Sequence, residues 1–289
     1  MPTAELTTHT LDAPGATLTY DIRRSDASRE PALLMIGSPM GASGFGALAD
    51  RFPCWTVVTY DPRGSERSKR TDGAAESTPE EHADDLHRLI SAVGGGPVDV
   101  FASSGGAVNA LALVARHPED VRTLVAHEPP LWQLLPDREA GLAAATDIHD
   151  TYLRGGRGPA MAKFIALVSL EGPIPADYLD RPDPDPAMFG LPTEDDGSRD
   201  DPLVGQNMIS CSYFVPDIVA LRSAPTRIVV GVGAESSKVV TGRAAMAVAE
   251  LLGTKPATFP GGHGGFVPAE WGQGGDPDAF AATLRQVLG

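Results

Sequence analysis

A serine lies where an apolar segment meets a helical pattern, and its neighbours suit nucleophilic chemistry. The mostly apolar run 98–101 leads into Ala-Ser-Ser-Gly-Gly, and a segment with helical periodicity follows. A strained strand-to-helix turn exposes a serine hydroxyl, and the positions two before and two after that serine must be small. Ala102 and Gly106 meet this requirement for Ser104, whereas centring the turn on Ser103 would place a phenylalanine in a small position. We therefore predict that Ser104 is a nucleophile.

A serine hydroxyl is a poor nucleophile at neutral pH, so it needs a base, an acid that orients the base, and donors for the developing oxyanion. Among the seven histidines we favour His263 as the base, because four glycines surround it and let its loop approach another backbone closely. His82, His87 and His117 lie on or beside predicted helices, where we expect solvated side chains.

Two glutamates are candidates for the acid. Glu235 follows the strongly apolar segment 226–232, and Glu128 ends the apolar segment 121–126. Both stand at the carboxyl ends of predicted strands, where functional groups gather in open α/β sheets. We favour Glu235 and keep Glu128 as the alternative.

Two backbone N–H groups are candidates for the oxyanion hole. One belongs to Gly105, directly after the nucleophile, and the other to Ser38 in the loop 37–41. Pro39 in the same loop has no N–H and cannot donate.

Apolar strands alternate with helical patterns along much of the chain. A hairpin is predicted from segments 5–12 and 16–24, and further strands from 32–36, 55–60, 98–101, 121–126, 226–232 and 256–259. Helices are predicted over 78–93, where Thr78 and Glu81 form a capping-box pattern, and over 107–115 and 276–288. This alternation predicts an α/β fold with a mostly parallel sheet covered on both faces.

The alternation stops between residues 129 and 225. Helical patterns occur at 138–153, 160–170 and 203–221, and the stretch 180–202, with five prolines and eight acids, is typical of a solvated loop. We therefore predict a core formed by 1–129 and 224–289, with an inserted lid at 130–223.

The formal net charge of −15 and the pI near 4.8 disfavour nucleic acid and anionic membranes as partners. No apolar run has the length of a signal peptide or of a membrane span. We expect a soluble cytoplasmic protein whose substrate is small, uncharged and largely apolar. The oligomeric state is not predicted.

Six residues are candidates for substrate contact because they are apolar or aromatic and lie in the insertion or near the predicted catalytic loops. They are Met40, Trp132, Phe164, Met208, Tyr213 and Phe266. Ordinary core packing is the alternative role for most of them.

Taken together, these motifs resemble the alpha/beta-hydrolase superfamily over nearly the whole chain. Ile-Gly-Ser-Pro-Met-Gly is similar to the oxyanion loop, with Ile36 where histidine is common, and Phe-Ala-Ser-Ser-Gly-Gly to the nucleophile turn. Gly-Gly-His-Gly-Gly-Phe is similar to the catalytic histidine loop. Glu235 stands at the family's usual acid position, and Glu128 at the alternative position that some haloalkane dehalogenases use.

The resemblance implies a sheet of the eight-stranded type flanked by helices, with an inserted helical lid. It also implies a serine hydrolase that cleaves a carboxylic ester, or a related lactone or thioester, through an acyl-enzyme and without a metal or organic cofactor. A cofactor-free perhydrolase or haloperoxidase would use the same residues. A non-hydrolytic binding protein or pathway cyclase is a further alternative, because a fold does not fix a function.

Overall fold

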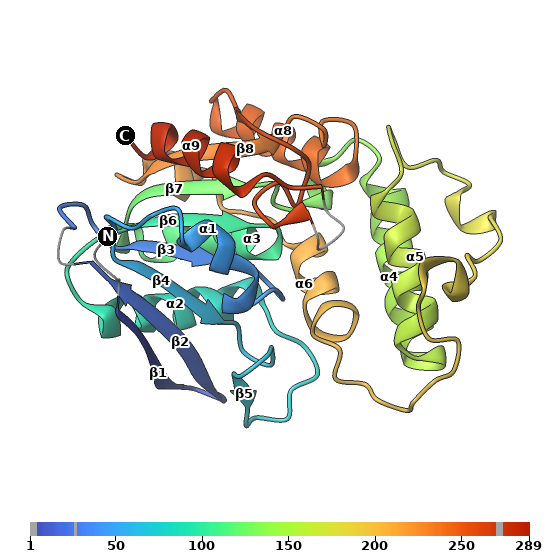
Figure 1. Ribbon diagram of the computed structural model, residues 1–289. Helices are drawn as coiled ribbons and strands as arrows, with labels where there is room; N and C mark the ends of the chain where they lie inside the picture. The colour runs from blue at the N-terminus through green and yellow to red at the C-terminus, as the bar shows by residue number, and fades with distance from the viewer. Residues whose placement is uncertain (1–4, 26–27, 270–273) are drawn as a thin grey trace.

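The computed structural model describes residues 5–25, 28–269 and 274–289. Within these ranges nine strands form one sheet in the order β1-β2-β4-β3-β6-β7-β8-β9, with β5 paired to β2 (Figure 1). The strands are β1 (Glu5–Ala13), β2 (Ala16–Arg24), β3 (Leu33–Ile36), β4 (Val57–Asp61), β5 (Lys69–Arg70), β6 (Val98–Ser103), β7 (Val121–His127), β8 (Arg227–Gly233) and β9 (Ala257–Phe259). Pairing is antiparallel from β1 to β4 and parallel from β4 to β9. The predicted hairpin and the mostly parallel sheet are confirmed.

Helices cover both faces of this sheet. Those of the core are α1 (Gly46–Ala49), α2 (Pro79–Val93), α3 (Gly105–Arg116), α8 (Val240–Leu252) and α9 (Pro277–Leu288). The start of α2 is the predicted capping box, since Thr78 Oγ1 accepts from the Glu81 N–H at 3.2 Å and the Glu81 carboxylate accepts from the Thr78 N–H at 3.0 Å. Helix α8 was not predicted from the sequence.

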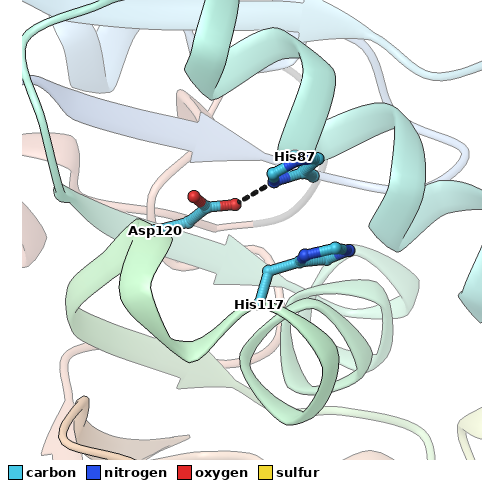
Figure 2. A group of neighbouring side chains, drawn as sticks. All are labelled: His87, His117 and Asp120. Carbon is cyan, nitrogen blue, oxygen red and sulfur yellow. Dashed lines mark hydrogen bonds and ion pairs between the residues drawn. The ribbon is translucent and has the colours of Figure 1, made fainter.

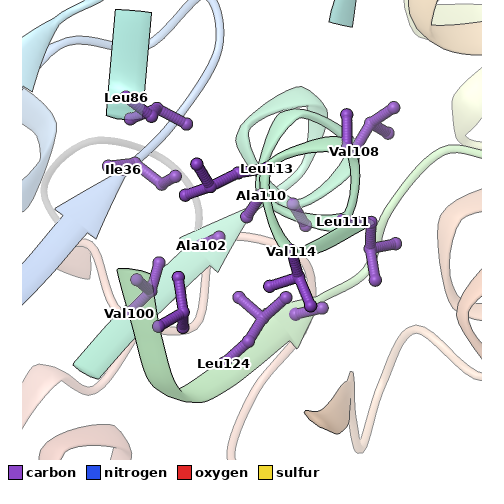
Figure 3. Close-up of a cluster of buried hydrophobic side chains, with 14 of the residues drawn as sticks. Ile36, Leu86, Val100, Ala102, Val108, Ala110, Leu111, Leu113, Val114 and Leu124 are labelled. Atoms are coloured by element: carbon purple, nitrogen blue, oxygen red, sulfur yellow. The ribbon is translucent and has the colours of Figure 1, made fainter. Parts of the chain in front are cut away.

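Two apolar clusters cover the two faces of the sheet, and strand alternation divides the side chains between them. In β3, Leu34 and Ile36 join the cluster beneath α2, α3 and α8, whereas Leu33 and Met35 join the cluster beneath α1 and α9. Figure 3 shows the first cluster, in which leucines and valines of α3 lie against Val100 and its neighbours in β6 and β7. This packing fixes α3, and with it the turn that precedes α3, on the sheet.

Residues 130–223, between β7 and β8, are largely helical, and we call them the inserted segment. It contains α4 (Arg138–Gly155), α5 (Arg157–Val168), α6 (Met208–Tyr213) and α7 (Ile218–Ser223). In Figure 1, α4 and α5 lie side by side away from the sheet, and α6 lies between them and the core. The inserted segment has its own apolar cluster, which also includes Val240 and Ala244 of α8.

The single helix predicted over 203–221 is wrong. A π-helical stretch (Pro202–Asn207) is followed by α6, and an extended break separates α6 from α7. Pro216 accounts for the break, because proline disfavours helical backbone in the residue before it and has no N–H for a helix. No helix in the described ranges is long and apolar enough to cross a membrane.

Candidate active site

Five parallel strands end at the same edge of the sheet, and the candidate residues follow those ends. Ser38 follows β3, Ser104 follows β6 and Glu128 follows β7. Glu235 comes after β8 and His263 after β9. Because parallel strands share a carboxyl edge, residues far apart in the sequence meet there.

Ser104 occupies a sharp turn between β6 and α3. Its backbone dihedral angles are φ 58° and ψ −131°, which is a strained conformation for a residue with a side chain. Its N–H donates to the carbonyl oxygen of His127 at 3.0 Å, so the turn is attached to the end of β7. Ser103 is buried within β6, whereas Ser104 is partly exposed.

The two glycines after Ser104 let the loop after β3 approach the turn. A Cβ on Gly106 would lie 2.7 Å from Gly37 Cα, and one on Gly105 would lie 2.6 Å from the Ser38 carbonyl oxygen. Larger residues would therefore push the loop away from the turn. Among the described residues, no acceptor takes a hydrogen bond from the Gly105 or Ser38 backbone N–H, so both remain available for an oxygen of a ligand.

His263 is hydrogen-bonded to Glu128. The distance between His263 Nδ1 and Glu128 Oε2 is 2.7 Å, and the carboxylate also accepts from the Gly233 N–H at 2.8 Å and from Thr241 Oγ1 at 2.9 Å. Glu128 is fully buried and has a positive φ of 48°. Burial by itself would raise the pKa of Glu128, but the hydrogen bond and charge of His263, with further donors, lower this pKa to about 2. The carboxylate is therefore ionised at neutral pH.

Glu235 does not pair with His263. Its side chain is exposed, and its carboxylate accepts no hydrogen bond from the described residues. Its backbone N–H donates to the Gly261 carbonyl oxygen at 3.0 Å, so it supports the histidine loop through the main chain. Glu235 was favoured from the sequence as the acid, but in the structure His263 is hydrogen-bonded to Glu128 instead.

Ser104 and His263 both lie beside His127 at the end of β7. The His263 ring stacks near the His127 ring, with centroids 6.2 Å apart, and His127 is the residue whose carbonyl holds the Ser104 N–H. Among the described residues no hydrogen bond joins Ser104 Oγ to His263. Contacts of this kind are often long until a substrate is bound.

His127 is a buried neutral histidine beneath this site. Its Nδ1 lies 3.1 Å from Ser103 Oγ, its Nε2 has no partner among the described residues, and aromatic rings surround it. Burial lowers the pKa of His127 to about 4. No role for His127 was predicted from the sequence, and its burial follows from its place in a central strand.

The stability of the protein is expected to fall as pH decreases from about 6.5 to 4. An unfolded chain protonates its histidines near pH 6.5, whereas folded His127 stays neutral until about pH 4, so the unfolded state takes up the proton first. Buried His82, whose pKa burial also lowers, acts in the same direction. The loss attributable to His127 is at most about 3 kcal/mol.

Thermal unfolding across this pH range tests the expectation. His127→Asn keeps a partner for Ser103 and removes the titrating group, so its Tm should depend less steeply on pH than that of the wild type. His9→Asn changes an exposed histidine and should keep the wild-type slope. Equal slopes in the wild type and His127→Asn would contradict the assignment.

A buried amide from the inserted segment holds the loop after β3. Asn207 Oδ1 lies 3.3 Å from Ser38 Oγ and 2.9 Å from His82 Nε2, and all three side chains are buried. The amide oxygen can only accept, so both partners donate to it and His82 carries its proton on Nε2. The expectation that His82 is solvated is wrong, because it points from α2 into this contact.

Four of the predicted substrate-contact residues belong to the inserted segment. Trp132 and Met208 are buried in its apolar cluster, and Phe164 packs against the same cluster. Tyr213 is exposed, and its hydroxyl is hydrogen-bonded to Thr146 Oγ1 at 2.8 Å. Cys211 of α6 lies near the serine turn, with its Sγ 3.4 Å from the position of a Cβ on Gly105.

The other two candidates pack in the core. Met40 lies under its own loop against Gly37 and Gly44, and Phe266 is 2% exposed in a cluster of aromatic rings with Phe45. Phe266 therefore has the packing role given above as the alternative. Two surface hollows, of about 160 and 320 Å³, lie over α4–α5 and beside β2, and neither is lined by the candidate catalytic residues.

Comparison with known proteins agrees with this architecture. A family model described as "alpha/beta hydrolase fold" matches residues 42–149. The "Uncharacterized hydrolase YraK" of Bacillus subtilis (strain 168) is 32% identical over 270 residues, which cover 89% of each chain. The protein belongs to the alpha/beta hydrolase family. The fold is also similar to those of solved structures whose sequences have low identity to this chain.

One such structure is the enol-lactonase from Burkholderia xenovorans LB400, with a TM-score of 0.65 and 16% identity over 97% of this chain and 99% of that one. Another is the carboxylesterase CesB (YbfK) from Bacillus subtilis, with a TM-score of 0.66 and 15% identity over 98% and 92% of the two chains. These likenesses concern the fold.

Three residues of this alpha/beta hydrolase site were not singled out from the sequence. Asn207 and Thr241 come from segments that show no motif, and His127 sits within an apolar strand. Glu128, by contrast, was a candidate because it ends the apolar segment 121–126.

Proposed function

We propose that the protein is a serine hydrolase of carboxylic esters or of related lactones and thioesters. The observation that carries the proposal is the 2.7 Å hydrogen bond from His263 to the buried carboxylate of Glu128, beside the strained turn of Ser104. A fixed histidine and a serine on a rigid turn are the parts that acyl transfer requires.

In the proposed reaction, His263 Nε2 removes the proton of Ser104 Oγ as that oxygen attacks the carbonyl carbon of the substrate. Glu128 holds the Nδ1 proton, which leaves Nε2 as the basic nitrogen and stabilises the imidazolium. The N–H groups of Gly105 and Ser38 bind the oxyanion. The leaving alcohol takes the proton from His263, and a water that His263 activates then releases the acid and frees Ser104.

The substrate is expected to be small or medium in size, uncharged and largely apolar. The formal net charge of −15 opposes anionic substrates. From the inserted segment, the weakly polar Cys211 lies near the serine turn, with its Sγ 3.4 Å from the position of a Cβ on Gly105. We propose that this segment acts as a lid through α6.

Hydrolysis of a panel of p-nitrophenyl esters of increasing acyl length, together with lactones and thioesters, tests the proposal. We expect turnover of one of these classes and a single fluorophosphonate adduct on the protein. Peroxide-dependent halogenation of a phenol indicator, with no ester turnover, would favour a perhydrolase or haloperoxidase. Ligand binding without turnover or adduct would favour a non-hydrolytic protein.

Asn207→Leu is expected to lower kcat by about 10- to 100-fold with a smaller effect on KM. Loss of the amide removes the hydrogen bond to the Ser38 side chain, so the Ser38 N–H is held less firmly toward the oxyanion. One oxyanion donor is typically worth roughly 10²–10³ in rate. Steady-state kinetics on the best substrate of the panel measures the effect.

Two further variants separate positioning from a general loss of structure. Ser38→Ala keeps the backbone donor and breaks the same contact, so its effect and that of Asn207→Leu should not add in the double variant. Ser210→Ala removes a hydrogen bond from α6 to the Ser77 carbonyl oxygen and should leave kcat near the wild-type value. Additive effects, or an equal loss in Ser210→Ala, would contradict the positioning role.

A further inference from the structure

Two histidines and an aspartate lie close together at the C-terminal end of α3, the end opposite Ser104. His87 lies on α2, His117 directly follows α3, and Asp120 ends the short 3-10 turn Pro118–Asp120 (Figure 2). His87 Nδ1 is 2.6 Å from Asp120 Oδ2, and the two imidazole rings stack with centroids 4.0 Å apart. All three residues are partly buried, which restricts their side chains. The proposed reaction uses none of them.

We propose that His87, His117 and Asp120 bind a first-row transition-metal ion such as Zn²⁺. Each offers one donor atom, and these three atoms lie within 4.8 Å of one another. Two imidazole nitrogens and a carboxylate oxygen are a donor set that zinc accepts, with water in the fourth position. Zinc–ligand bonds of about 2.1 Å place neighbouring donors about 3.4 Å apart. Because the two rings are stacked with an interplanar angle of 12°, an imidazole must rotate out of the stack before both ring nitrogens point to the ion. The ion replaces the proton shared by His87 and Asp120.

The charge around the cluster favours a cation. Asp84 Oδ1 is 3.5 Å from His117 Nε2, and Glu119 Oε1 is 4.0 Å from His117 Nδ1. Arg116 pairs with Asp84 and offsets one of these carboxylates. Asp120 and Glu119 remain to balance the charge of the ion, on a protein whose formal net charge is −15.

The site joins segments that are separate in the sequence. His87 belongs to α2, whereas His117 and Asp120 belong to the connection from α3 to β7. An ion bound to all three links these segments in the folded state only, so it stabilises that state. The 12 residues of α3 span about 18 Å, which separates the ion from Ser104 at the opposite end of that helix.

The test titrates the purified full chain with Zn²⁺ by calorimetry and with Co²⁺ by visible absorption. We expect one saturable site, a rise in Tm with Zn²⁺, and a Kd raised at least about tenfold in His87→Gln and in His117→Gln. Both histidines are partly exposed, and the Tm without metal shows that each variant is folded. His9→Gln should bind as the wild type does.

Three outcomes would overturn the proposal. The first is the absence of saturable binding by the wild type at millimolar metal. The second is binding by His117→Gln with the wild-type Kd. The third is binding that persists in His117→Gln and disappears in His263→Gln, which would place the ion at the candidate active site instead.

Discussion

Ser104→Ala is expected to abolish ester turnover, with kcat reduced on the order of 10⁶-fold. The Ser104 hydroxyl is the protein group that forms a bond to the substrate carbon in the proposed reaction, and no other residue replaces it. The oxyanion donors and the bound substrate account for whatever rate remains. The same variant should form no fluorophosphonate adduct in an intact-mass measurement, whereas the wild type forms one.

Ser103→Ala is the matched control for this experiment. Ser103 is the preceding residue, and its hydroxyl lies 3.1 Å from buried His127 and away from the proposed reaction. We expect this variant to keep the adduct and most of the turnover. An adduct that forms on Ser104→Ala but not on Ser103→Ala would move the nucleophile to Ser103 and contradict the assignment.

Glu128→Gln is expected to lower kcat by about 10⁴-fold, and Glu235→Gln to leave it close to the wild-type value. Glu128 accepts the Nδ1 proton of His263, which leaves Nε2 free to act as a base. A glutamine amide turned toward His263 favours the opposite tautomer and does not stabilise an imidazolium. Glu235 is exposed and supports its loop through the backbone. Steady-state kinetics of the two variants measures the difference.

The two glutamine variants keep the size of the side chain, so the comparison isolates charge. The fold of Glu128→Gln is checked by its Tm, because the Gly233 N–H and Thr241 also donate to this carboxylate. A large loss in Glu235→Gln alone would return the acid to the position favoured from the sequence. Equal small losses in both variants would contradict both assignments.

Much of the fold could be predicted from local patterns. Short apolar runs bounded by turn residues matched β3, β4, β6, β7 and β8, and the capping box placed the start of α2 at Thr78. These patterns depend on neighbours in the chain, which a sequence displays directly. The helix predicted over 203–221 was wrong because the effect of Pro216 was overlooked, although that residue is equally visible in the sequence.

The sequence by itself determined which groups are present for catalysis: a serine on a strand-to-helix turn, a histidine among glycines and two glutamates at strand ends. It could not choose between Glu128 and Glu235, because both follow parallel strands and the choice depends on which carboxylate faces the His263 ring. Only the tertiary structure decided this pairing, by burying Glu128 with three donors and leaving Glu235 exposed. The contact of Asn207 with Ser38, and that of His87 with Asp120, likewise arise from packing between segments distant in the chain.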